Sequence, residues 1–222
     1  MESLERLVTI PAGSADVEGM LHIPAQPLGV VVFAHGSGSS RFSPRNNHVA
    51  EALRELRIGT LLMDLLTAGE DEQYRTRFNI ALLTERLAAA LDWLRKEGGQ
   101  GALPLGLFGA STGAAAALQV AAQQPVAAVV SRGGRPDLAG TAALGRVHAP
   151  TLLIVGGEDK VVIELNKAAY DALHCEKRLA IVAGATHLFE EPGALDEVAE
   201  MAGNWFLSHF TEGHRSHGKH GG

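Results

Sequence analysis

Cysteine is nearly absent from this sequence, because Cys175 is the single cysteine among 222 residues. One thiol cannot form an intramolecular disulfide, and it cannot supply the several ligands of a multi-cysteine metal site. We interpret Cys175 as a small, buried, apolar residue rather than as a reactive thiol. We therefore expect no disulfide framework and no metal site.

An excess of positive charge is also lacking. The chain has 19 lysines and arginines against 25 aspartates and glutamates, which gives a formal net charge of −6 with neutral histidines. The basic residues are scattered rather than gathered into stripes, so the electrostatic footprint of a nucleic-acid-binding protein is missing. We expect no nucleic-acid partner.

Long apolar runs are missing as well. No stretch approaches the roughly 18 apolar residues that a membrane-spanning helix needs, and the opening residues, MESLERLVTI, lack a basic segment followed by an apolar one. We expect a soluble, cytoplasmic protein that does not bind membranes. Internal repeats and low-complexity linkers are absent too, so no pattern indicates a domain boundary inside the chain.

Hydrophobic residues make up 46% of the chain, which is enough for one full core. We therefore predict a single domain over residues 1–211. The last segment, residues 212–222, is polar and rich in glycine and histidine, and we predict a flexible tail there. We expect its histidines to bind a metal only adventitiously.

Short apolar runs alternate with segments of helical periodicity. Two runs, at 6–12 and 18–24, are separated by turn-forming residues and predict an antiparallel hairpin. The alternation predicts an α/β fold, with a mostly parallel sheet of about eight strands, helices on both faces and no large lid. The other expected strands, apolar on both faces, are 29–36, 59–64, 103–110, 126–133, 150–157 and 177–184, and the expected helices are about 44–57, 75–97, 112–124, 162–174 and 194–210.

The segment GLFGASTG places a serine directly after one of these strands. Its pattern G-x-S-x-G, with Ser111 between Gly109 and Gly113, is typical of a sharp strand-to-helix turn that exposes a nucleophilic hydroxyl at the positive end of a helix. The small flanking residues are needed because the turn brings neighbouring backbone close. The motif alone is equally compatible with a serine that only caps the helix.

An activated serine needs a histidine base and a carboxylate that orients it. In an α/β scaffold these follow the serine in the order acid, then histidine, each after a later strand. Asp159 follows the strand 150–157 and His187 follows the strand 177–184, with Glu158 as the other candidate acid. Taken singly, Asp159 is more typical of a helix N-cap and His187 of a loop or packing histidine, but the shared order favours a triad.

The loop after the strand 29–36 can supply part of an oxyanion hole. We predict the backbone N–H groups of Ser37 and Thr112 as the two donors. A dinucleotide-binding loop is the competing interpretation, but Arg41 stands where its third small residue is needed. We expect His35 to hydrogen-bond and shape this loop rather than to act as a base.

The four segments HGSGSS, GASTG, GGEDKVV and GATHLF together resemble the α/β-hydrolase superfamily, and in particular its small, lidless, dienelactone hydrolase-like members. Dienelactone hydrolases proper carry a cysteine nucleophile, whereas this chain has serine. The resemblance implies a serine esterase that forms an acyl-serine intermediate and needs no cofactor. Hydrolysis of lactones or thioesters, acyl transfer, and a non-catalytic binding scaffold are the alternatives.

The substrate is the least determined feature of the sequence. We expect a small-molecule ester with a short chain, because a scaffold without a lid encloses little apolar surface. Candidate contacts are Gly36, Gly38, Arg41 and Arg132, and we consider Arg45 and Arg135 as further arginines at the pocket border. These arginines are suited to bind a carboxylate or phosphate, or equally to pair with acidic residues of the loops. No pattern indicates an oligomeric state.

Overall fold

A computed structural model describes residues 2–96 and 103–216 of the chain. Its strands are β1 (Leu4–Ala12), β2 (Ala15–Ile23), β3 (Gly29–Ala34), β4 (Ile58–Met63), β5 (Leu105–Ala110), β6 (Ala128–Arg132), β7 (Thr151–Gly156) and β8 (Lys177–Val182). Its α-helices are α1 (Pro44–Glu55), α2 (Ala68–Asp71), α3 (Ile80–Lys96), α4 (Thr112–Ala121), α5 (Thr141–Leu144), α6 (Lys160–Ala172) and α7 (Ala194–Ser216). Two 3₁₀ turns, η1 (Thr76–Phe78) and η2 (Pro136–Ala139), complete the set.

The eight strands form one sheet in the order β1-β2-β4-β3-β5-β6-β7-β8. The predicted N-terminal hairpin is confirmed, and β2 pairs antiparallel with β4 as well as with β1. All other pairings are parallel, so β2 is the one strand that runs against the rest. The predicted α/β fold with a mostly parallel eight-stranded sheet is therefore confirmed.

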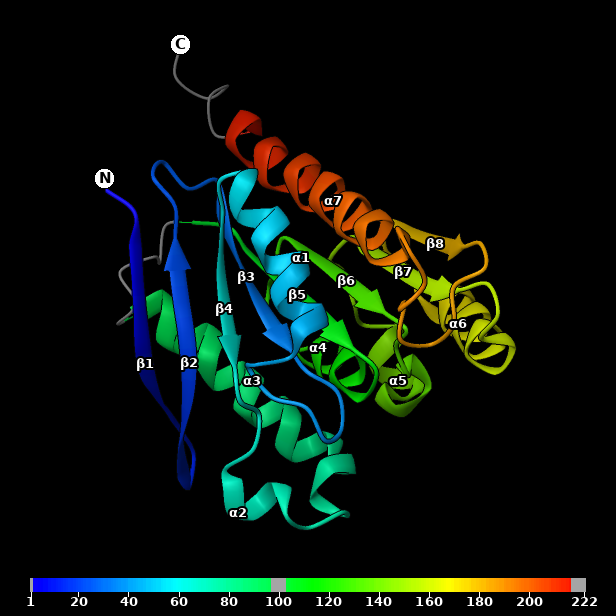
Figure 1. Cartoon of the computed structure of the whole chain (residues 1–222), viewed down its shortest axis with the longest axis horizontal. Coiled ribbons are helices and arrows are strands. Elements are labelled where there is room, and N and C mark those ends of the chain that lie inside the picture. Colours follow the sequence, from blue (N-terminus) through cyan, green and yellow to red (C-terminus); the bar gives the residue numbers. More distant parts are fainter. Residues whose placement is uncertain (1, 97–102, 217–222) are drawn as a thin grey trace.

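Helices cover both faces of the sheet. Figure 1 shows α1 and α7 in front of the central strands, with α3, α4 and α5 behind them. Accordingly, one apolar core lies between the sheet and α1 with α7, and the other lies on the opposite face against α3, α4 and α6. Every residue of β3, β4, β5, β6 and β7 is buried, which explains their continuous apolar runs.

The short helices α2 and α5 were not predicted, because a helix of four residues is too short to show a repeating pattern of apolar residues. A capping box closes the start of α2: the Thr67 side chain accepts from the Glu70 N–H, and the Glu70 carboxylate accepts from the Thr67 N–H. Glu70 also accepts from the fully buried Arg86 of α3 at 2.7 and 3.1 Å. A pair 16 residues apart thus anchors α2 to the body of the fold.

The C-terminal helix is longer than the helix predicted at about 194–210. Helix α7 continues to Ser216, five residues beyond the predicted end of the ordered chain at residue 211. No proline interrupts this stretch, and a single glycine weakens a helix without ending it. The remainder of the predicted tail, 217–222, lies outside the described residues. Within the part that is described, no helix is both long and apolar enough to cross a membrane.

Candidate active site

A cavity of about 260 Å³ opens at the carboxyl ends of β3, β5 and β6. This is the edge where open parallel sheets bind their ligands. Five predicted site residues line it, namely Gly36, Ser37, Ser111, Arg132 and His187. The other lining residues are Ser39, Ser43, Arg45, Asn46, Ala110, Gly133 and Leu188. A larger hollow of about 630 Å³ runs along α3 but contains none of the predicted site residues.

Ser111 occupies the strained turn that the motif predicts. Its φ of 52° and ψ of −121° lie outside the regions that non-glycine residues ordinarily adopt. A Cβ on Gly109 would lie 2.7 Å from the Ala114 nitrogen, and one on Gly113 would lie 2.6 Å from the His35 carbonyl oxygen. The turn therefore requires glycine at both positions, as expected.

The capping interpretation of Ser111 does not match the geometry. Ser111 stands at the N-cap position of α4, but its side chain makes no capping hydrogen bond. Its backbone is held instead, because its N–H donates to the Arg132 carbonyl at 3.3 Å and its carbonyl accepts from the Arg135 N–H at 3.1 Å. The hydroxyl is thus presented to the cavity by a backbone bonded to the neighbouring strand.

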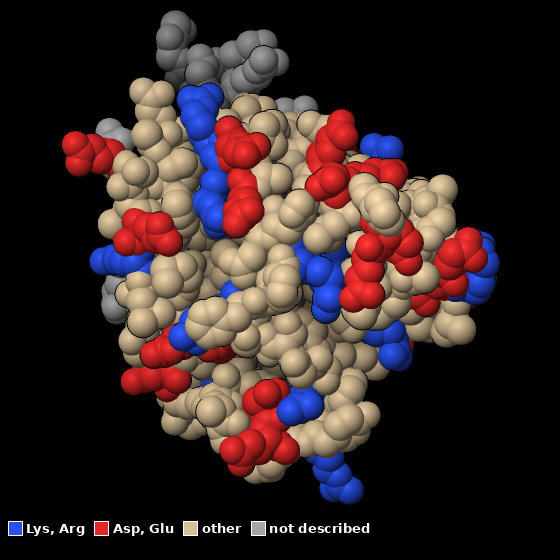
Figure 2. Space-filling model, in the orientation of Figure 1, with Lys and Arg blue, Asp and Glu red and all other residues tan. Residues whose placement is uncertain are grey.

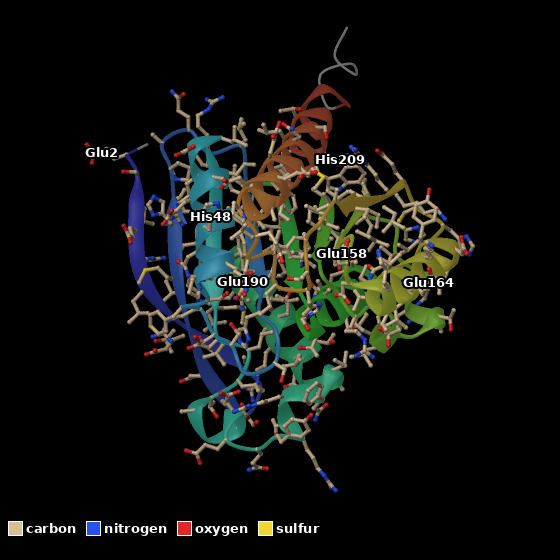
Figure 3. The ribbon with its side chains drawn as sticks, turned by 45° about the vertical axis from the view of Figure 1, so that its right-hand side comes forward. Glu2, His48, Glu158, Glu164, Glu190 and His209 are labelled. Carbon is tan, nitrogen blue, oxygen red and sulfur yellow. The ribbon has the colours of Figure 1, made fainter. Side chains whose placement is uncertain are left out.

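Asp159 and His187, 28 residues apart in the chain, lie in contact. The His187 Nδ1 is 2.6 Å from the Asp159 Oδ2. Asp159 precedes α6 as its N-cap residue without a capping hydrogen bond from its side chain, so the carboxylate is available to the imidazole. The neighbouring Glu158 is exposed and lies in the same loop after β7 (Figure 3). The structure therefore places Asp159, and not Glu158, against the histidine.

The loop after β3 brings its backbone against the elbow. A Cβ on Gly36 would lie 3.1 Å from the Ser111 Cβ, so the two residues are nearly in contact. The Gly36 carbonyl accepts from the Ser39 N–H at 3.2 Å and faces the His35 Nδ1 at 2.8 Å. The Gly36 carbonyl and the Ser37 N–H belong to the same trans peptide group, in which C=O and N–H point in opposite directions. The Ser37 N–H therefore points away from Ser39 and His35. Thr112 begins α4, where backbone N–H groups lack intrahelical acceptors.

His35 holds this loop as a neutral imidazole. The Leu65 N–H donates to its Nε2 at 2.9 Å, so the ring proton is on Nδ1 and is donated to Gly36. Burial lowers the pKa of His35, and the hydrogen bond to Gly36 opposes this only in part. The expected role of His35 in shaping the loop agrees with these contacts.

We expect the buried His35 to make the protein less stable in mild acid. The unfolded chain binds a proton near pH 6.5 whereas the folded chain resists it, so this contribution to stability is complete above pH 6.5 and is lost as the pH falls below it. Urea unfolding of the wild type and His35→Phe between pH 8 and 5 measures this. The variant is expected to be about 1–3 kcal/mol less stable at pH 8, because the Leu65 N–H loses its acceptor. A difference that does not shrink toward pH 5 would contradict the assignment.

The predicted arginine contacts divide into two groups. Arg41 does not line the cavity, because its guanidinium pairs with Asp64 and, at 2.7 Å, with Glu18. Arg135 pairs with Asp137 at 2.7 and 2.9 Å in the same way. Both side chains therefore follow the alternative expectation, in which the arginines pair with acidic residues of the protein.

Gly38, a predicted substrate contact, does not line the cavity either. It lies beyond the cavity with φ of +69°, and a Cβ there would approach Arg77. In contrast, Arg45 and Arg132 do line the cavity. Asn46, which sequence reasoning missed, lies beside them. The sequence signal that could have identified Asn46 is the Ser43-Pro44 pair. This pair starts a helix and so places Arg45 and Asn46 in its first turn.

The comparisons with known proteins decide the family. The family described as "Alpha/beta hydrolase domain" matches residues 27–204. The chain belongs to the α/β-hydrolase family. This α/β hydrolase is 52% identical to a dienelactone hydrolase from Anabaena variabilis, whose crystal structure superposes with a TM-score of 0.90 over 94% of this chain and 99% of that one.

A second relative is much longer. A Mycobacterium tuberculosis protein, provisionally named a phosphoribosyl transferase, is 55% identical over 205 residues. The match covers 91% of this chain but 46% of that protein, so this α/β hydrolase spans about half the length of that relative. Est1E from Butyrivibrio proteoclasticus, with 15% identity, a TM-score of 0.78 and coverage of 92% and 99%, shares the fold.

Proposed function

We propose that this α/β hydrolase cleaves small carboxylic esters through an acyl-serine intermediate. The observation that carries the proposal is the 2.6 Å contact between Asp159 and His187, because His187 lines the same cavity as Ser111 on its strained turn. A serine on such a turn, a histidine and a carboxylate are the three parts of a hydrolytic triad. The dienelactone hydrolase that shares 52% identity supports the same class of chemistry.

The first half of the reaction forms the intermediate. Ser111 Oγ attacks the acyl carbonyl while the His187 Nε2 takes its proton, and the carbonyl oxygen becomes an oxyanion held by the N–H groups of Ser37 and Thr112. The tetrahedral intermediate then collapses, the bond to the alcohol breaks, and His187 returns the proton to the leaving oxygen. Asp159 stabilises the transient imidazolium and keeps the Nδ1–H oriented.

The second half consumes water. His187 removes a proton from a water molecule, whose oxygen attacks the acyl-serine carbonyl, and the same N–H groups hold the second oxyanion. Collapse releases the carboxylic acid, and the proton returns to Ser111. The machinery needs no metal for these steps. Among the described residues, no group of three or more His, Cys, Asp and Glu side chains is arranged to hold a metal ion.

The size of the cavity favours small substrates. Its volume of about 260 Å³ lies below the roughly 300–1,000 Å³ of pockets for drug-sized ligands. We therefore propose short-chain esters and expect 4-nitrophenyl acetate to be cleaved faster than the dodecanoate. Faster cleavage of the long chain would contradict this. The name of the M. tuberculosis relative does not alter the proposal, because the match covers 46% of that protein.

Labelling with a fluorophosphonate probe tests the proposal without a guess at the substrate. We expect stoichiometric phosphonylation of Ser111 in the wild type, mapped by peptide mass spectrometry, and none in Ser111→Ala or His187→Ala. The exposed turn residue Ser14 serves as the matched control, because Ser14→Ala is expected to label at the wild-type rate. A folded wild type without label at Ser111 would favour a non-catalytic scaffold.

A further inference from the structure

Arg132 is a buried cation at the wall of the cavity. It is the last residue of β6, and its backbone pairs with Ala110 of β5. Only 6% of its surface is exposed to solvent. The Nη2 reaches the Asn46 Oδ1 at 3.4 Å, a long hydrogen bond, and the buried Nε has no hydrogen-bond partner among the described residues. A buried charge with so few partners is costly to a fold.

The neighbouring charge increases this cost. Burial, and after it repulsion from Arg45, lowers the pKa of Arg132 to about 10, so the side chain remains cationic at neutral pH. Arg45 pairs with the exposed carboxylate of Glu190 at 3.6 Å, which leaves Arg132 as the member of this pair of arginines that has no carboxylate partner. Glu190 lies close to α1 in Figure 3. The Arg45 Nε is buried without a partner as well.

The other buried arginine among the described residues, Arg86, does not share this feature, because the Glu70 carboxylate lies 2.7 Å from it. Within the part of the chain that the structure describes, Arg41, Arg77, Arg86, Arg95 and Arg135 each have a carboxylate within 3.5 Å or less. No carboxylate there lies within ion-pairing distance of Arg132. The guanidinium carbon of Arg132 lies over the Phe189 ring, 5.8 Å from its centroid. This contact supports the face of the guanidinium group but gives its N–H groups no carboxylate partner.

A further feature makes the same wall electropositive. Helix α1 begins beside the cavity, because its N-cap Ser43 and its first-turn residues Arg45 and Asn46 line it, and a helix N-terminus carries a partial positive charge. Basic and acidic side chains are otherwise intermixed on the face shown in Figure 2. The uncompensated charge of Arg132 is therefore a property of this wall rather than of the face that Figure 2 shows.

We propose that Arg45 and Arg132 bind an anionic group, a carboxylate or a phosphate, of the ester that Ser111 attacks. The inference rests on the proposed function, since it adds a substrate class to the same cavity. Planar guanidinium groups match either anion with paired N–H donors, and the ligand would supply the counter-charge that the fold leaves out. Because the cavity is small, the anionic group and the scissile carbonyl belong to one short molecule.

A matched pair of substrates tests the inference. Mono-4-nitrophenyl glutarate carries a free carboxylate, and its methyl ester is neutral but otherwise alike. We expect the wild type to favour the anionic ester by at least about tenfold in kcat/KM, the ratio that a 1.4 kcal/mol interaction gives. In Arg45→Gln and Arg132→Met this ratio is expected to approach one. Arg135→Gln, which loses an exposed pair, is the control and is expected to keep it.

Stability separates binding from a structural role. Since the Arg132 charge is poorly compensated, Arg132→Met is expected to melt at the wild-type temperature or above. Inorganic phosphate and glutarate, tested separately, are expected to slow fluorophosphonate labelling of Ser111 in the wild type but not in Arg132→Met. The more effective anion identifies the natural group as phosphate or carboxylate.

The outcomes distinguish the two proposals. Equal turnover of the charged and neutral esters, or a clear loss of stability in Arg132→Met with unchanged selectivity, would overturn the anion site and leave the esterase proposal standing. If Ser111 takes up no label, the esterase proposal fails. In that case a rise in melting temperature with phosphate or glutarate, absent in Arg132→Met, would still support the anion site.

Discussion

Replacement of Ser111 by alanine is expected to lower kcat/KM for 4-nitrophenyl acetate by about 10⁴-fold or more. The variant removes the atom that forms the acyl intermediate, and His187 alone can activate only water. Alanine keeps the Cβ of serine, so it is expected to tolerate the φ of 52° as serine does. Steady-state kinetics under pseudo-first-order conditions, together with melting temperatures, measure both expectations.

The control for this variant is again Ser14→Ala, since Ser14 is exposed in the turn of the N-terminal hairpin, far along the chain from the cavity residues. It is expected to retain wild-type kinetics. Residual activity in Ser111→Ala within about tenfold of the wild type would argue against a serine nucleophile. A large fall in melting temperature would instead assign the loss of turnover to the fold.

Replacement of Asp159 by asparagine is expected to lower kcat by about 10³- to 10⁴-fold. The carboxylate accepts the Nδ1–H of His187 at 2.6 Å, and this fixes the tautomer whose Nε2 is free to take the proton of Ser111. An amide can donate its own N–H to Nδ1 and so stabilise the opposite tautomer. The pH profile of kcat for the wild type and the variant, with 4-nitrophenyl acetate, measures the effect.

Glu158→Gln is the matched control, because the two acidic residues are adjacent and only Asp159 contacts the histidine. It is expected to stay within about twofold of the wild type, as is usual for the loss of an exposed charge. An equal loss in both variants would indicate a general electrostatic effect of the loop. A loss confined to Glu158→Gln would transfer the role to the neighbouring carboxylate.

Most of the fold could be predicted because each strand and long helix carries its own local pattern. Strands β3 to β7 read as continuous apolar runs since both of their faces are covered, whereas β1 and β2 alternate because only one face is buried. The strand order could not be read in the same way. β4 lies between β2 and β3, a pairing that depends on contacts between segments some 40 residues apart.

The triad candidates could be located because each stands directly after a strand in a loop of recognisable composition. The sequence favoured Asp159 as the acid but left Glu158 open as an alternative, since both residues lie in one loop. Only the position of His187, 28 residues later, separates them. The arginines were ambiguous for a similar reason. Arg41 pairs with Glu18 and with Asp64, and Asp64, 23 residues away, carries no local signal of its proximity.

The sequence by itself determined the α/β fold with its hairpin, the strained turn at Ser111 and the loops from which Asp159 and His187 project. These features depend on periodicity and turn chemistry, which act over a few residues. Only the tertiary structure decided that Asp159 contacts the histidine, that Arg41 and Arg135 are neutralised, and that Arg45 and Arg132 face the cavity together. The charged residues at this edge of the sheet come from segments that are distant in the sequence. Their partners are therefore set by the packing of the helices and strands, which local sequence patterns do not show.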